Sequence, residues 1–127
     1  MTNLLTLTSL PLFPLNTVLF PGGQLSLRVF EVRYLDMVRK CHLAGAPFGV
    51  VSLTSGEEVR RPFQQPEVFH AVGTLAQVTR LDSPQPGLLQ IQCQGHARMR
   101  VDRQRLLPHG LWVADVTLLP LDQHMTV

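Results

Sequence analysis

The sequence carries little charge and almost no lysine. Charged residues make up 16% of its 127 residues, and Lys40 is the only lysine among 11 basic residues. The formal net charge is only +2 at pH 7. Proteins that bind nucleic acids by neutralising phosphates usually carry more positive charge than this. The composition therefore disfavours phosphate-driven binding, while the 45% of apolar residues is enough to build a core.

Cysteine is also scarce, and no apolar stretch is long. Cys41 and Cys93 lie far apart in apolar-patterned segments, so we expect reduced, buried thiols rather than a disulfide scaffold. Pro11, Pro14 and Asn16 break the longest apolar run well below the ~18 residues that spanning a bilayer requires. No basic segment typical of a secretory signal precedes this run. We therefore expect a cytoplasmic protein with no membrane association.

Prolines and glycines, by contrast, are plentiful and divide the chain into short extended segments. The ten prolines and nine glycines are spread as punctuation and form no repeat. Apolar and polar residues alternate over 24–29, 89–101 and 112–118, which is the period of half-buried strands. Gly95 lies inside the longest of these segments and predicts a bend or bulge there. We expect about six or seven strands in a single domain over residues 1–127.

One segment, at about residues 31–44, has the period of a helix. Its apolar face consists of Tyr34, Leu35, Val38 and Cys41. Its polar face includes Arg33, together with Asp36 and Lys40 at the spacing of an i, i+4 ion pair. Gly45 supplies a stop signal. The sequence thus predicts a mainly β fold, a partly closed antiparallel barrel with one α-helix.

No catalytic or metal-binding motif is present in the sequence. A phosphate-binding loop needs Gly-Lys followed by Ser or Thr, but Lys40 is flanked by Arg39 and Cys41. Neither Gly-x-Gly-x-x-Gly nor Gly-x-Ser-x-Gly occurs, and the five histidines lack the spacing of a helical zinc site. Glu31 opens the helix beside Arg33, where an ion pair or a cap is its ordinary role. We expect no catalytic residue, no metal ligand and no cofactor.

Two surfaces are candidates for contacts with macromolecules. Arg98 and Arg100 point outward from one strand and suit an acidic or nucleic-acid partner, although a solvated face is the commoner explanation. The polar segment 57–67 is predicted to be an exposed loop. Phe63 lies within it between two prolines, and an exposed phenylalanine there can grip a polypeptide. Anchoring of the loop on the core is the commoner role for such a residue.

Several segments, in order along the chain, resemble the N-terminal substrate-recognition domain of Lon proteases. They read LPLFPL from residue 10, VLFPG from 18, LSLRVFEVRY from 25, FGVV from 48, VGTLA from 72 and QGHARMRV from 94. The resemblance covers nearly the whole chain. It departs from the family pattern at Gln94, where Val or Arg is common before the glycine.

The resemblance implies a PUA-like β-barrel with one helix and a non-catalytic, protein-binding role. The implied partners are unfolded or tagged polypeptides and an ATP-dependent protease, since no ATPase or protease domain fits in this sequence. Candidate polypeptide contacts are Phe13, Leu15, Phe63 and the strand edge near Trp112. Family members commonly continue into a helical bundle, and the sequence stops at Val127, so we expect this bundle to be missing.

Nucleic-acid binding is the alternative function. It is motivated by the PUA-like fold and by the arginines between residues 98 and 105, and fold analogy alone is a weak argument for function. Affinity for RNA that falls steeply with salt would indicate it. The sequence leaves open the identity of the substrate, the recognition surface and whether the chain forms a homo-oligomer.

Overall fold

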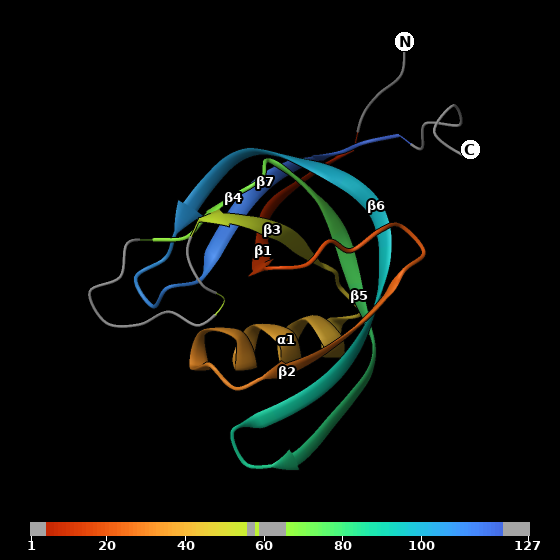
Figure 1. The fold of residues 1–127 in the computed structure, drawn as a ribbon, viewed down its shortest axis with the longest axis vertical. Helices are drawn as coiled ribbons and strands as arrows, with labels where there is room; N and C mark the ends of the chain where they lie inside the picture. The colour runs from red at the N-terminus through yellow and green to blue at the C-terminus, as the bar shows by residue number, and fades with distance from the viewer. Residues whose placement is uncertain (1–4, 56–57, 59–65, 121–127) are drawn as a thin grey trace.

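The computed structural model describes residues 5–55, 58 and 66–120, which form seven strands and one helix (Figure 1). The elements are β1 (Thr6–Leu15), β2 (Gln24–Val29), α1 (Val32–Ala44), β3 (Phe48–Ser55), β4 (Val68–Phe69), β5 (Val72–Gln85), β6 (Leu88–Leu106) and β7 (Trp112–Leu118). No helix in the described part of the chain has the length and apolar character needed to span a bilayer.

The sheet closes on itself through β1. Its strand order is β1-β7-β6-β5-β3-β4, and β1 also pairs with β3. The β1–β3 pairing is parallel, whereas the other pairings around the ring are antiparallel. A closed ring leaves none of its member strands with an unpaired edge. The predicted mainly β, barrel-like fold with one helix is confirmed, and its closure depends on one parallel pair.

β6 organises the fold because it pairs with three other strands. Its first half pairs with β2, its second half pairs with β7, and β5 runs along both halves. The register between β5 and β6 shifts beside Gly95, as predicted. A Cβ added at Gly95 would lie 2.3 Å from the carbonyl oxygen of Phe20. Glycine therefore allows the turn before β2 to lie against β6, where Gly22 and Gly23 hydrogen-bond to Gly95.

Two apolar clusters form the interior. The first packs α1 against the barrel and β2, and it includes Tyr34, Val38 and Phe48. The second lies among strands of the ring and includes Leu12 and Trp112. In Figure 1, α1 lies below the ring, and β2 crosses in front of it. The helix thus covers one open end of the barrel, with β2 along its flank.

Both cysteines are free and buried, as predicted. Burial raises the pKa of Cys41, and it raises the pKa of Cys93 to about 12. A thiol with a raised pKa is protonated at neutral pH and is a poor nucleophile. These residues therefore act as small apolar side chains in the core.

Candidate functional site

β2 offers a free strand edge. It pairs with β6 on one side, and no described residue pairs with its other side. Its sequence, QLSLRV, contains no proline, and Arg28 is its only charged residue; proline and charged side chains commonly limit further pairing at strand edges. The unpaired N–H and C=O groups along this side can accept an additional extended strand.

A hollow of about 240 Å³ lies along the free edge of β2. Ser26 and Arg28 contribute to it from one face of the strand, and Leu27 and Val29 contribute from the other. Residues of both faces line it, and none of its lining residues belongs to β6, so the hollow lies on the side of β2 away from β6. Its volume is below the ~300–1,000 Å³ typical of sites that enclose small molecules. It is better matched to a side chain of an extended polypeptide.

Aromatic and apolar side chains form much of the lining. Phe13 and Leu15, from the end of β1, line the hollow but are only 5% and 2% exposed. The Phe13 ring stacks on that of Tyr34, with 4.0 Å between centroids. Phe30 also lines the hollow, and it is 54% exposed. Two predicted contact residues therefore lie at this site with little free surface, and Phe30 presents the accessible ring.

The sequence analysis did not identify Phe30 as a contact residue, although its position in the alternating pattern indicates this role. Gln24, Ser26 and Arg28 are the outward-facing positions of β2, and Phe30 continues their parity. An apolar residue at an outward position, immediately after a half-buried strand, is a candidate for contact with another molecule.

Trp112, another predicted contact residue, does not join this site. Trp112 is 9% exposed and belongs to the second apolar cluster. Its indole N–H donates to Glu67 at 3.2 Å, and its ring meets that of Phe69 edge-on. Phe63 lies outside the described residues. The structure thus separates Trp112 from Phe13 and Leu15.

Arg33 lies beneath the site, where it pairs with the lining residue Glu31. The prediction that Arg33 lies on the solvent-exposed face of the helix is wrong, because its side chain is buried. Its guanidinium donates to Glu67 at 2.9 Å and to the carbonyl of Gly110 at 3.0 Å. Burial would lower the pKa of Arg33, but Tyr34 and the carboxylates of Glu67 and Glu31 raise it above the ordinary value. Acceptors from distant segments therefore make burial of this charge tolerable.

The ion pair predicted for Glu31 is present. Its carboxylate lies 3.3 Å from Nε of Arg33, and its side chain makes no capping hydrogen bond to α1. The predicted pair on the exposed helix face, Lys40 with Asp36, also forms at 2.9 Å. Within the described residues, no group of three or more His, Cys, Asp or Glu is placed to hold a metal ion.

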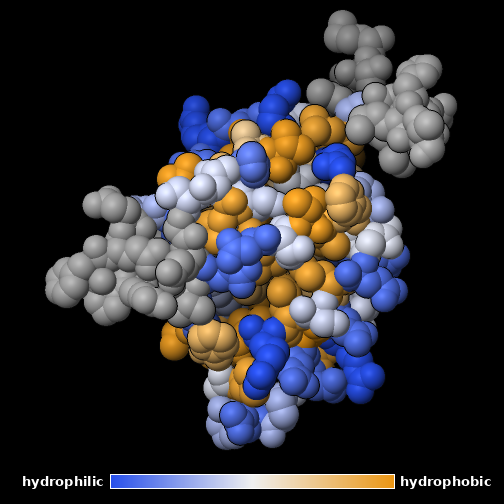
Figure 2. All heavy atoms as spheres, in the orientation of Figure 1, coloured by the Kyte–Doolittle hydropathy of each residue, from blue (hydrophilic) through white to orange (hydrophobic). Residues whose placement is uncertain are grey.

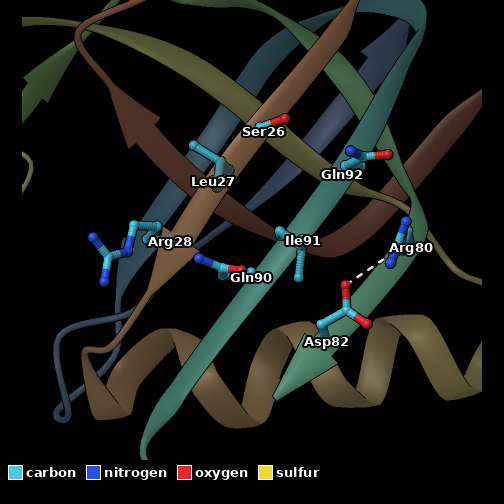
Figure 3. A pocket seen from close by; sticks show the side chains of 8 residues that line it. All are labelled: Ser26, Leu27, Arg28, Arg80, Asp82, Gln90, Ile91 and Gln92. Atoms are coloured by element: carbon cyan, nitrogen blue, oxygen red, sulfur yellow. Dashed lines mark hydrogen bonds and ion pairs between the residues drawn. The ribbon is translucent and has the colours of Figure 1, made fainter. Parts of the chain in front are cut away.

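The outer face of β2, β6 and β5 carries a second hollow of about 270 Å³ (Figure 3). Arg28 lies opposite Gln90, which in turn lies opposite Asp82. Arg80 pairs with Asp82 at 3.0 Å, whereas Arg28 has no ion-pair partner among the described residues. Figure 3 shows the Arg28 side chain extending from β2 on the side away from β6. This guanidinium therefore projects toward the free edge.

The predicted anionic contact at Arg98 and Arg100 lies on another part of β6. The Arg98 guanidinium sits over the Phe20 ring, 5.6 Å from its centroid. Arg100 donates to Asp102 at 2.9 Å. A hydrogen bond from Thr117, and then Arg100, lower the pKa of Asp102. Both arginines thus have intramolecular partners, and their contact with an acidic or nucleic-acid partner stays a prediction.

The face of the molecule that is turned toward the viewer in Figures 1 and 2, where β2 lies in front, is rich in apolar side chains. Figure 2 shows them gathered across its middle, over β2 and the segment that precedes it. Val18 and Phe20 in that segment are exposed. Exposed apolar patches of this kind commonly mark contact sites for other macromolecules. The free edge and its hollow therefore lie beside further apolar surface.

Comparisons with known proteins point to one family. Residues 9–124 match the family model of the ATP-dependent protease La (LON) substrate-binding domain. A Lon protease of Flavobacterium johnsoniae is 32% identical over 95 residues, which are 74% of this chain and 11% of that protein. The chain thus spans a small part of that relative.

Two solved structures share the fold. A Lon N-terminal domain protein from Xanthomonas campestris is 40% identical, with a TM-score of 0.76 over 92% of this chain and 63% of that one. The N-terminal domain of a Mycobacterium avium complex Lon protease has a TM-score of 0.59 at 17% identity, over 91% of this chain and 56% of that one. The second likeness concerns the fold alone.

Proposed function

This chain belongs to the family of ATP-dependent protease La (LON) substrate-binding domains, and from this membership we propose that it is a non-catalytic polypeptide-binding module. Its substrates are unfolded or tagged polypeptides, which it presents for ATP-dependent proteolysis carried out by other domains or proteins. Two buried free thiols support a reducing compartment such as the cytoplasm.

The observation that carries the proposal is the free edge of β2 beside a hollow that aromatic and apolar side chains line together with Glu31 and Glu58. An extended polypeptide pairs its main chain with β2, and one of its side chains enters the hollow lined by Phe13, Leu15 and Phe30. Main-chain hydrogen bonds do not depend on side-chain identity. This mode therefore suits recognition of many different unfolded chains.

A direct test is fluorescence anisotropy with a labelled, permanently unfolded polypeptide such as reduced, carboxymethylated lactalbumin. We expect saturable binding with a Kd of roughly 1 to 100 μM, the range of modest affinities. An unlabelled eight-residue extended peptide should compete for the same site. Absence of saturable binding at these concentrations would overturn the proposal.

The strand-pairing mode has its own test, because alternate N–H groups of an added strand point toward β2 and away from it. Two versions of the peptide are N-methylated, one at odd and one at even residues. We expect one version to lose binding and the other to keep it. Equal affinity of the two versions would exclude main-chain pairing at a strand edge. Single-stranded RNA, titrated at two salt concentrations, serves as the competing ligand class.

A further inference from the structure

The two faces of β2 differ in chemistry along the whole strand. Gln24, Ser26 and Arg28 are exposed on the outer face. On the inner face, Leu25 and Leu27 are half-buried against the apolar core. A strand added at the edge continues the same pleat, so its successive residues fall alternately on these two faces. The inward residues of a ligand would then meet apolar surface, and the outward ones would meet polar surface.

Arg28 places a positive charge on the outer face at the edge. Its neighbour on β6 is the uncharged Gln90, and the acid opposite Gln90 on β5, Asp82, is paired with Arg80. Two carboxylates line the same hollow as Arg28, but Glu31 is paired with Arg33, and Glu58 accepts a hydrogen bond from the backbone N–H of Asn16. The guanidinium projects away from β6, toward the place of an added strand (Figure 3). Directly opposed residues of neighbouring strands interact, and opposite charges there are favourable whereas like charges are not.

We propose that the edge of β2 selects extended segments in which apolar and polar residues alternate, with an acidic residue opposite Arg28. This specificity rests on the proposed addition of a polypeptide strand at β2. The proposed specificity restricts the bound segments to those in which apolar and polar residues alternate, as in an amphipathic strand. Segments with contiguous apolar residues would place some of them against Gln24, Ser26 and Arg28, and a basic residue would meet the guanidinium.

The test compares three labelled eight-residue peptides. The first alternates leucine and serine around a central aspartate. The second has the same composition with its leucines contiguous, and the third replaces the aspartate with lysine. We expect the first to bind at least about tenfold more tightly than the second, and up to about fivefold more tightly than the third, the upper range for one cross-strand pair.

A charge reversal on the protein completes the test. Arg28→Glu should invert the preference, so that the lysine peptide binds more tightly than the aspartate peptide. Arg39→Glu is the matched control, because Arg39 is exposed on α1 and lines neither hollow. It should leave the preference of the unmodified protein in place. Circular dichroism and thermal midpoints verify that both variants fold.

Each outcome has a distinct meaning. Equal binding of the alternating and contiguous peptides overturns selection by period. An aspartate preference that survives Arg28→Glu overturns the role of Arg28, while the proposed function stands in both cases. If the unfolded polypeptide and all three peptides fail to bind, the proposed function itself fails.

Discussion

Nη1 of Arg33 donates to Oε2 of Glu67 at 2.9 Å, and both side chains are almost completely removed from solvent. The pair joins the first turn of α1 to the segment just before β4, 34 positions away. Trp112 donates its indole N–H to the other carboxylate oxygen of Glu67. Three segments that are distant in sequence are thereby fixed to one another.

Replacing Glu67 with glutamine should destabilise the protein strongly. Among the described residues, the change leaves the buried Arg33 guanidinium with Glu31 as its only charged partner. Breaking a buried ion pair costs about 3 kcal/mol or more. Urea unfolding followed by the fluorescence of Trp112 measures the loss. Asp36→Asn breaks the exposed pair with Lys40 and should cost less than about 1 kcal/mol, so equal losses in the two variants would contradict this account.

Gly95→Ala should displace the turn before β2. The new Cβ would lie 2.3 Å from the backbone oxygen of Phe20, and such crowding costs about 1–3 kcal/mol. The amide of Gly22 donates to the Gly95 carbonyl, so its hydrogen exchange, followed by NMR, should accelerate. Gly87→Ala is the control, because Gly87 has open space around it and a φ of 78°.

In the Gly87→Ala control, the loss of stability comes from backbone conformation, because a residue with a side chain in the left-handed region costs about 1–2 kcal/mol. The exchange of the Gly22 amide should stay slow. An unchanged Gly22 exchange rate in Gly95→Ala would show that the turn tolerates the added methyl group.

The sequence predicted the half-buried strands well because alternation is visible wherever one face meets the core and the other meets solvent. β2, β6 and β7 were found in this way, as was the irregularity at Gly95. Partial closure of the sheet was predicted, but the parallel pairing of β1 with β3 that completes the ring was not. Residues 12–15, which form the parallel pair with β3, are all buried and show no alternation. Their pairing partner is fixed by tertiary packing that no local pattern encodes.

The site was predicted less completely, for a related reason. Helical periodicity places Arg33 among exposed polar residues, yet acceptors at Glu67 and Gly110 bury it. Glu67 itself ends a segment that the sequence assigns to an exposed loop. Contacts between residues so far apart override local polarity. The same holds for Phe13, whose burial depends on its stack with Tyr34 across the fold.

Stability should decline at alkaline pH because of the buried Cys93. Burial raises its pKa to about 12, whereas an unfolded thiol ionises at about 8.5. Between these values the unfolded state binds fewer protons than the folded state, so the free energy of unfolding falls as pH rises. The slope from one thiol is at most about 1.4 kcal/mol per pH unit. Cys41, whose pKa burial also raises, acts in the same direction.

The comparison of the protein with Cys93→Ala isolates this effect. Urea unfolding at several values between about pH 8 and 10 should give a shallower decline for the variant. Absolute stabilities differ for packing reasons as well, so the slopes are compared. Parallel slopes would mean that the Cys93 thiol ionises equally readily in both states.

Phe30→Ser should weaken polypeptide binding without destabilising the fold. Phe30 is 54% exposed and lines the hollow, and substitutions at exposed positions usually change stability by less than about 0.5 kcal/mol. Phe13→Ala, by contrast, should destabilise the fold. It removes a buried ring that stacks on Tyr34, and such truncations cost about 3–5 kcal/mol. Anisotropy titration with the unfolded polypeptide and urea unfolding measure the two quantities.

The matched control is Leu43→Ser, which removes another exposed apolar side chain, at the opposite end of α1 from the hollow. If binding depends on the hollow, Phe30→Ser lowers affinity and Leu43→Ser leaves it unchanged. Equal losses of affinity would mean that general surface hydrophobicity drives the binding, because the two side chains are both apolar and exposed but lie at different places on the surface. Unchanged affinity in Phe30→Ser would remove the exposed ring from the site, since a side chain that meets the ligand in the hollow has to lose contact area when it becomes serine.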